Sequence, residues 1–159
     1  MSLFSLDLSR SVEYLLDWYK EKNAREELNL NLKERLFWEL TWNLEILNEL
    51  DLLGNEEDEN ILQLKKSLIS KLNFNQFDII SSAGIPMNKI VLGDFDLINL
   101  KKYTNYLKNI NTNSKLVQKT YHRLRIHQLR FDFNITKNSN STKYLKFLCQ
   151  NSKRVLNND

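Results

Sequence analysis

Hydrophobic residues recur every three or four positions along most of this chain of 159 residues. That recurrence is the period of an α-helix that packs one face against a core. In the first such segment, residues 7–22, the recurring positions are Val12, Leu15, Leu16 and Tyr19. The same criterion predicts helices over residues 31–53, 58–72, 94–110, 114–133 and 142–156, whereas residues 74–80 either form a further short helix or belong to the connection. We therefore predict an all-α fold, a single-domain bundle of five or six helices.

The segment 31–53 carries the strongest helical pattern. Asn31, with Glu34 three residues later, fits a helix-capping sequence, and Gly54 stands where a glycine commonly ends a helix. A helix that is apolar on two sides needs neighbours on both. We therefore predict a central helix, with its aromatic residues in the core rather than on a base-stacking surface. One apolar stripe consists of Leu36, Phe37, Leu40, Leu44, Leu47 and Leu50, and the other of Trp38, Trp42, Ile46 and Leu53.

The connections are poor in the residues that tight turns need. The chain has 3 Gly and 1 Pro, too few for a many-stranded sheet, and the β-prone triplet 90–92 has no partner strand. Residues 81–86 are typical of a break between helices, and residues 137–142 of a polar linker. We therefore divide the chain into a helical bundle domain, residues 1–136, and a polar linker with a basic C-terminal helix, residues 137–159, which either docks on the bundle or stays loosely attached.

The net charge of +3 conceals a division of charge along the chain. Residues 1–100 contain 10 Lys and Arg and 18 Asp and Glu, a net charge of −8, whereas residues 101–159 contain 13 and 2, a net charge of +11. A basic half of this kind can bind nucleic acid or another polyanion. It can equally pack against acidic helices of the same chain, or join copies head to tail through opposite charges.

The basic residues of the segment 114–133 gather on one side of its predicted helix. Lys115, Lys119, Arg123 and Arg130 form a ridge there, with His122 and Arg125 beside it. Cations one helical turn apart lie about 6 Å from each other, near the spacing of phosphates along a nucleic-acid strand. A solvated face, or one paired with the acidic helices, is the alternative. The predicted nucleic-acid-binding residues are Lys115, Lys119, Arg123, Arg125 and Arg130.

Residues that bear catalytic chemistry are few, and none is arranged for metal binding. His122 and His127 lie on different sides of the predicted helix, and Cys149 is the only cysteine, whereas a zinc site takes four ligands, or three and a water. His127 lies toward the apolar side, where we expect a core residue hydrogen-bonded to a neighbour. Phosphate loops and nucleophile elbows are absent from the sequence. We predict no enzyme activity, no metal and no cofactor.

Arg123 and His127 form a short pattern that resembles the Arg-to-His motif of the HEPN family of helical-bundle ribonucleases. The family motif places four to six residues between the two, with a polar residue directly after the Arg. Here three residues separate Arg123 from His127, and Leu124 is apolar. The resemblance implies, as an alternative function, a HEPN-like ribonuclease with atypical spacing. Arg123 and His127 would then be the residues to test.

Glu39 and Asn43 stand one helical turn apart beside the main apolar stripe of the segment 31–53. A buried Asn needs hydrogen-bond partners, and we predict Tyr121 or His127 as the partner of Asn43. We expect Glu39 and Asn43 to have a structural role rather than a catalytic one.

Location and partners follow from features that the chain lacks. With a single cysteine, no disulfide can form within the chain. The first residues lack the basic start of a signal peptide, and no run of about 18 apolar residues is present. We therefore expect a cytoplasmic protein that does not bind membranes.

Together these observations predict a non-enzymatic helical accessory or interaction protein, which binds a protein partner or a larger assembly. Its basic C-terminal half would bind nucleic acid or another polyanion. Besides the HEPN-like ribonuclease, the alternative is a structural oligomer that self-associates through opposite charges.

Overall fold

The computed structural model describes the backbone of residues 3–20, 25–54, 58–97, 100, 102–132 and 139–157, and the side chains of the same residues except 3–8, 18, 132, 139 and 140. These ranges contain seven α-helices and one 3₁₀ turn, and no strand. The predicted all-α fold is therefore confirmed. The elements are α1 (Leu3–Lys20), α2 (Arg25–Leu52), α3 (Glu59–Ser70), α4 (Asn75–Ser82), α5 (Met87–Ile90), η1 (Thr104–Tyr106), α6 (Asn113–Asp132) and α7 (Ser139–Asn157).

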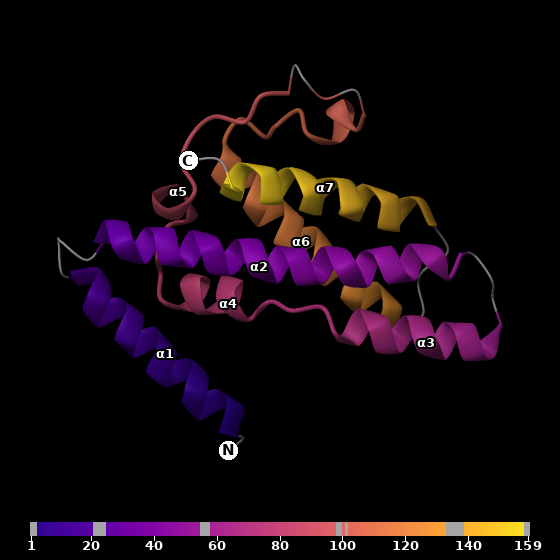
Figure 1. Ribbon diagram of the computed structural model, residues 1–159, viewed down its shortest axis with the longest axis horizontal. Helices are drawn as coiled ribbons and strands as arrows, with labels where there is room; N and C mark the ends of the chain where they lie inside the picture. Colours follow the sequence, from indigo (N-terminus) through magenta and orange to yellow (C-terminus); the bar gives the residue numbers. More distant parts are fainter. Residues whose placement is uncertain are drawn as a thin grey trace.

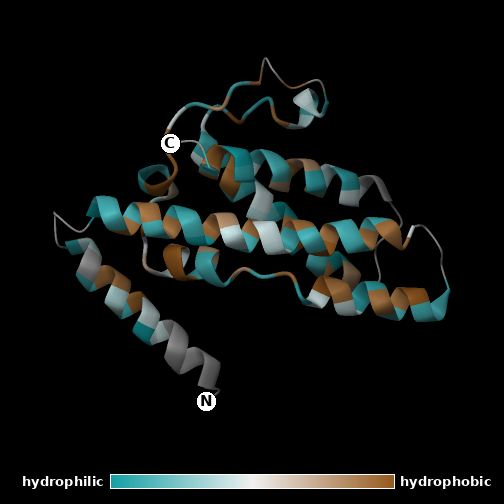
Figure 2. Ribbon diagram, in the orientation of Figure 1, coloured by the Kyte–Doolittle hydropathy of each residue, from teal (hydrophilic) through white to brown (hydrophobic). Residues whose placement is uncertain are grey.

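The long helix α2 is the axis of the bundle (Figure 1). It has α7 along one side and α3 and α4 along the other, α6 crosses behind it, and α1 projects from its N-terminal end. Hydrophobic and hydrophilic residues alternate along the helices (Figure 2). Because the spacing of three or four residues keeps side chains on one face of a helix, the buried side of α2 is one leucine stripe. It consists of Leu28, Leu32, Leu36, Leu40, Leu47 and Leu50.

Only one of the two apolar stripes predicted for α2 is buried. In the second stripe Ile46 is buried, but Trp38 and Trp42 are 61% and 50% exposed. The prediction that these two indoles belong to the core is therefore wrong. The Trp42 indole N–H donates to the carbonyl of Lys71 (3.0 Å), just beyond the end of α3. An indole suits such a rim position because its ring covers apolar surface while its N–H keeps a partner.

The N-terminal end of α2 differs from the end that the sequence pattern predicts, whereas its C-terminal end agrees. The helix begins at Arg25, and not at the predicted Asn31, because Leu28 and Leu32 continue the buried stripe toward the N-terminus. Its C-terminal end agrees with the prediction. Gly54 has φ +63, a left-handed conformation that glycine adopts without the steric cost of a Cβ atom.

Helix α7 is packed into the bundle, which is one of the two arrangements that the sequence leaves open for the basic C-terminal helix. It contacts α2 and α6, and Leu148 and Cys149 are buried. The hydroxyls of Thr120 on α6 and Ser152 on α7 hydrogen-bond in the buried interface (2.8 Å). Thr120 and Ser152 thus add polar residues to the packed faces of α6 and α7. A pattern of hydrophobic residues alone does not reveal them. Of the predicted linker, residues 137 and 138 lie outside the described residues, and residues 139–142 begin α7.

The helix predicted over residues 94–110 is not formed. The described residues of that range form an irregular segment, which contains η1 and begins with an isolated antiparallel bridge from Asp94 to Thr112. Tyr103 has φ +60, a left-handed conformation that interrupts a right-handed helix. Leu107 and Ile110 are nevertheless buried, whereas Tyr106 is 65% exposed, so the pattern identified some of the side chains that face the bundle but not the backbone conformation. The buried residues of this second, smaller core are Leu107, Ile110, Leu116 and Leu148.

Truncation of Leu148 tests whether α7 belongs to the core. Because Leu148 is fully buried, we expect Leu148→Ala to lower the free energy of unfolding by about 2–5 kcal/mol. The measurement is urea-induced unfolding followed by circular dichroism. The exposed Leu129 on α6 provides the control, since Leu129→Ala should change stability by less than about 0.5 kcal/mol. Equal, small effects of the two substitutions would contradict the packing of α7.

Candidate nucleic-acid interface

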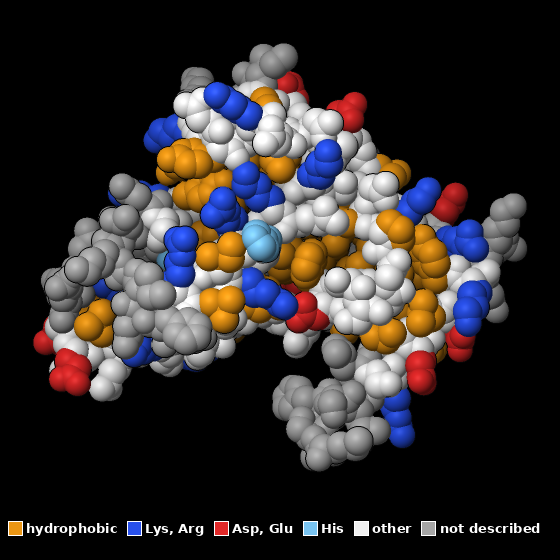
Figure 3. All heavy atoms as spheres, turned by 180° about the vertical axis from the view of Figure 1, so that it is seen from behind, with side chains coloured by type: hydrophobic (Ala, Val, Ile, Leu, Met, Phe, Trp, Pro, Cys, Tyr) orange, Lys and Arg blue, Asp and Glu red, His pale blue; other side chains and the backbone are white. Residues whose placement is uncertain are grey.

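Helix α6 has a buried side and a basic side. The backbone N–H of Lys115 donates to the Thr112 hydroxyl (3.3 Å), which caps the first turn. Beside the core residues of the helix, the side chains of Lys115, Arg123 and Arg130 are exposed and that of Lys119 is half-buried. Viewed from behind, Lys and Arg side chains gather around a histidine on this part of the surface (Figure 3). The buried residues of α6 are Ser114, Leu116, Val117, Thr120, Tyr121, Leu124 and His127.

Lys119 and Arg123 are neighbouring cations without a carboxylate partner among the described residues. The Lys119 ammonium donates to the carbonyl of Tyr106 in η1, and Lys115 donates to the side chain of Asn111 (2.9 Å). Partial burial, and then the positive charge of Arg123, lower the pKa of Lys119. An anion placed beside both side chains would relieve this repulsion. We call Lys115, Lys119, Arg123 and Arg130 the α6 ridge.

Arg125, which the sequence placed in the interface, is held by an ion pair. Its guanidinium lies 2.5 and 2.6 Å from the two carboxylate oxygens of Asp78 and 4.8 Å from the centre of the Phe74 ring. A second pair, Lys146 with Asp51 (2.8 Å), also joins the basic half of the chain to the acidic half. Packing of acidic against basic elements therefore accounts for part of the divided charge, but not for the α6 ridge.

An aromatic cluster lies beside the ridge, and sequence reasoning missed it. The Tyr106 ring lies 5.5 Å from that of Tyr144 on α7 and 6.3 Å from that of Tyr103. The Tyr103 ring in turn lies 4.9 Å from that of Phe147. Burial raises the pKa of Tyr144, and the nearby charge of Arg123 opposes this shift. The recurring tyrosines of residues 94–110 were the available signal, but the expected helix gave them a different arrangement.

His127 is buried, as predicted, with only 5% of its surface exposed. Its ring packs edge-on against Phe131 (5.4 Å between ring centres), and its Nε2 atom has no hydrogen-bond partner within the described part of the chain. Desolvation, and then the charge of Arg130, lower the pKa of His127 to about 4. The imidazole is therefore neutral near pH 7. Since Arg123 is exposed, the two residues of the HEPN-like pattern do not share an accessible surface.

Glu39 and Asn43 are buried polar residues on α2 that hold the segment before α4. Asn43 accepts from the backbone N–H of Asn73 and donates to its carbonyl (both 2.7 Å), so the predicted partners Tyr121 and His127 are wrong. The Glu39 carboxylate accepts the backbone N–H of Gln76 (2.7 Å) at the start of α4. Burial raises the pKa of Glu39, and the hydrogen bonds from the α4 backbone oppose this shift. Both contacts are structural, because they satisfy backbone groups that no helix or sheet satisfies.

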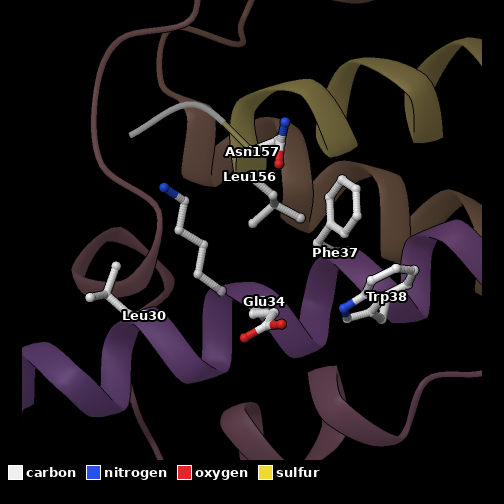
Figure 4. Close-up of a pocket in the computed structure, with 7 residues that line it drawn as sticks. Leu30, Glu34, Phe37, Trp38, Leu156 and Asn157 are labelled. Carbon is white, nitrogen blue, oxygen red and sulfur yellow. The ribbon is translucent and has the colours of Figure 1, made fainter.

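A surface hollow lies between the N-terminal half of α2 and the end of α7 (Figure 4). It has a volume of about 300 Å³. Phe37, Trp38 and Leu156 line it together with the oppositely charged Lys33 and Glu34. The hollow is thus lined by a mixture of apolar and charged side chains.

Metal sites and membrane-spanning segments are not found among the described residues. No group of three or more His, Cys, Asp or Glu side chains in this part of the chain could hold a metal ion. Within the same limits, none of the helices combines the length and the apolar run needed to cross a lipid bilayer. Comparison of the chain with models of known protein families, with curated proteins and with solved structures gives no match.

The pH dependence of stability tests the burial of His127. A histidine in the unfolded chain takes up a proton near pH 6.5, whereas folded His127 does so only near pH 4. The unfolded state therefore binds more protons between these values, and stability falls as the pH is lowered through this window. We expect a loss of up to about 3 kcal/mol, measured by urea unfolding at a series of pH values.

Two variants separate this effect from other titrating groups. His127→Leu should remove the histidine-dependent part of the pH profile, whereas His122→Leu, at an exposed position of the same helix, should keep it. In the wild-type protein, the NMR shifts of the His127 ring should titrate well below pH 6. A titration of that ring near pH 6.5 would contradict the burial.

Proposed function

We propose that this protein is a non-enzymatic interaction protein whose α6 ridge binds the phosphate backbone of nucleic acid. One observation carries the proposal: within the described part of the chain, Lys119 and Arg123 lie side by side without a carboxylate partner, while Arg125 and Lys146 each have one. Exposed Lys115 and Arg130 extend the ridge in both directions along α6. A row of cations on one rigid helix supplies several phosphate contacts at once.

The ridge favours binding that depends on charge rather than on base sequence. Lys and Arg contacts to phosphate position a protein on nucleic acid but carry no sequence information. Each contact releases condensed counterions, which lowers the logarithm of affinity by about 0.7–0.9 per unit of log salt concentration. With four contacts, a rise from 50 to 200 mM salt should weaken binding on the order of 100-fold.

Binding, rather than catalysis, is also what the surroundings of the ridge support. The buried and neutral His127 cannot exchange a proton with a bound strand. The carboxylate of Asp78, which pairs with this helix, is already engaged by the guanidinium of Arg125. The ridge therefore presents cations, with the exposed His122 beside them and the phenol of Tyr106 nearby, a set that favours holding a polyanion over cleaving it.

Reversal of two ridge charges tests the proposal. We expect Lys119→Glu with Arg123→Glu to weaken the binding of labelled single-stranded RNA, single-stranded DNA and duplex DNA by at least about tenfold at 50 mM salt, with a shallower salt dependence. Fluorescence anisotropy measures the affinity, and circular dichroism checks that the variant is folded.

The matched control is Arg35→Glu with Lys66→Glu, two exposed positions on α2 and α3 that change the net charge equally. It should bind within about threefold of wild type. Equal losses in both double variants would mean that only net charge matters. No binding by folded wild-type protein, together with a molecular mass that depends on salt, would replace the proposal with self-association through opposite charges.

Arg125 should contribute little to this binding, although the sequence placed it in the interface. Arg125→Gln with Asp78→Asn removes the ion pair and leaves the net charge unchanged. We expect its affinity for single-stranded RNA to stay within about twofold of wild type, because a guanidinium that is already paired offers little further gain to a phosphate. A tenfold loss in the same anisotropy assay would show that Arg125 leaves Asp78 to bind the strand.

A further inference from the structure

Tyr106 stands apart from the other exposed aromatic residues because it is joined to the α6 ridge. Its side chain is 65% exposed, and its own carbonyl accepts the hydrogen bond of the Lys119 ammonium. Its ring also packs beside that of Tyr144 (5.5 Å), a residue close enough to Arg123 to feel its charge. One open aromatic ring and two cations are thus held together by contacts between three segments of the chain.

The ring of Tyr106 packs against the other rings of the aromatic cluster, Tyr103 and Tyr144. Tyr103 adopts a left-handed backbone, φ +60, which tyrosine rarely adopts. Its ring packs between Tyr144 (5.2 Å) and Phe147 (4.9 Å). This packing holds the turn that leads into η1, and η1 presents Tyr106 at the surface. A ring on such a support loses little conformational freedom when a ligand covers it.

From this juxtaposition we propose that the interface takes single-stranded nucleic acid, with an unpaired base stacked on Tyr106 and its phosphates along Lys119 and Arg123. This inference rests on the proposed function of the ridge and specifies its ligand. Aromatic rings beside a basic groove stack on any base, because every base has a π-face. In a duplex, the faces of the bases are covered by their neighbours, and only phosphates meet the ridge.

The exposed tryptophans of α2 do not offer an equivalent site. Trp38 shares its hollow with the carboxylate of Glu34, and Trp42 is tied to the Lys71 carbonyl. α2 also exposes the carboxylates of Glu45 and Glu49, which repel phosphate. Among the described aromatic residues, Tyr106 combines a largely exposed ring with nearby cations, Lys119 and Arg123, that have no carboxylate partner in this part of the chain.

The experiment compares strands that differ only in their bases. The probes are a labelled oligothymidylate, an abasic oligonucleotide of the same length and charge, and a duplex of that length. Since stacking of one base contributes a factor of roughly 5–100 in affinity, wild-type protein should bind the oligothymidylate more tightly than the abasic strand by about that factor. The single strand should also bind more tightly than the duplex.

Variants then assign the difference to one ring. Tyr106→Ala should bring the affinity ratio between the two single strands close to one while leaving abasic binding nearly unchanged. Tyr106→Phe, which keeps the aromatic face, should retain the ratio. Tyr14 is 63% exposed on α1, so Tyr14→Ala is the matched control and should retain it as well.

The possible results separate this inference from the proposed function. If wild-type protein binds both single strands equally, or the duplex best, the stacking site is wrong although the ridge still binds. If folded Tyr106→Ala loses both strands to the same extent, the ring acts on the ridge and not on a base, which also overturns the inference. If no oligonucleotide binds the wild-type protein, both proposals fail together.

Discussion

Burial of the leucine stripe of α2 is the interaction on which the other helices depend. The stripe faces α7, α4 and α5, and burying each leucine side chain contributes about 1.5–3 kcal/mol relative to leaving it in water. Glu39 and Asn43 interrupt the stripe, but both are satisfied by the backbone of residues 73–77. Because a misplaced segment would leave a buried carboxylate and a buried amide without partners, these two residues fix where α4 lies along α2.

The basic surface follows from the way α6 is enclosed. Its inner residues belong to the main core through Val117, Tyr121 and Leu124, and to the second core through Leu116. A charged side chain in either core would lose its hydration without gaining a partner. The Lys and Arg residues of α6 are therefore confined to the outer side of the helix, where their helical spacing makes them a row.

Which Lys and Arg residues of α6 and α7 pair with carboxylates depends on how the helices cross. Asp78 on α4 reaches Arg125, and Asp51 on α2 reaches Lys146. The irregular segment 102–111 brings no carboxylate to Lys119 or Arg123, but instead a carbonyl and the aromatic ring of Tyr106. The same division of charge along the chain thus has two consequences, since one part is paired within the bundle and another remains open to an anion.

The sequence by itself determined the fold class, the central position of α2, the end of that helix near Gly54 and the place of His127 on the apolar side of its helix. Each of these depends on local periodicity or on the backbone preference of one residue, both of which can be read without knowing the neighbours. Exposure of Trp38 and Trp42 was decided only by the tertiary structure, because a helical pattern shows which residues share a face but not whether another helix covers it.

The same limit applies to the candidate site. The basic side of α6 was visible in the spacing of its cations, whereas the partners of each cation were not. Arg125 is paired with Asp78, 47 positions earlier in the chain. Tyr106 lies beside the ridge because residues 102–111 fold as an irregular segment in place of a helix. Pairings at such separations depend on how elements cross in space, and this is why only the tertiary structure could decide which part of the basic surface stays open.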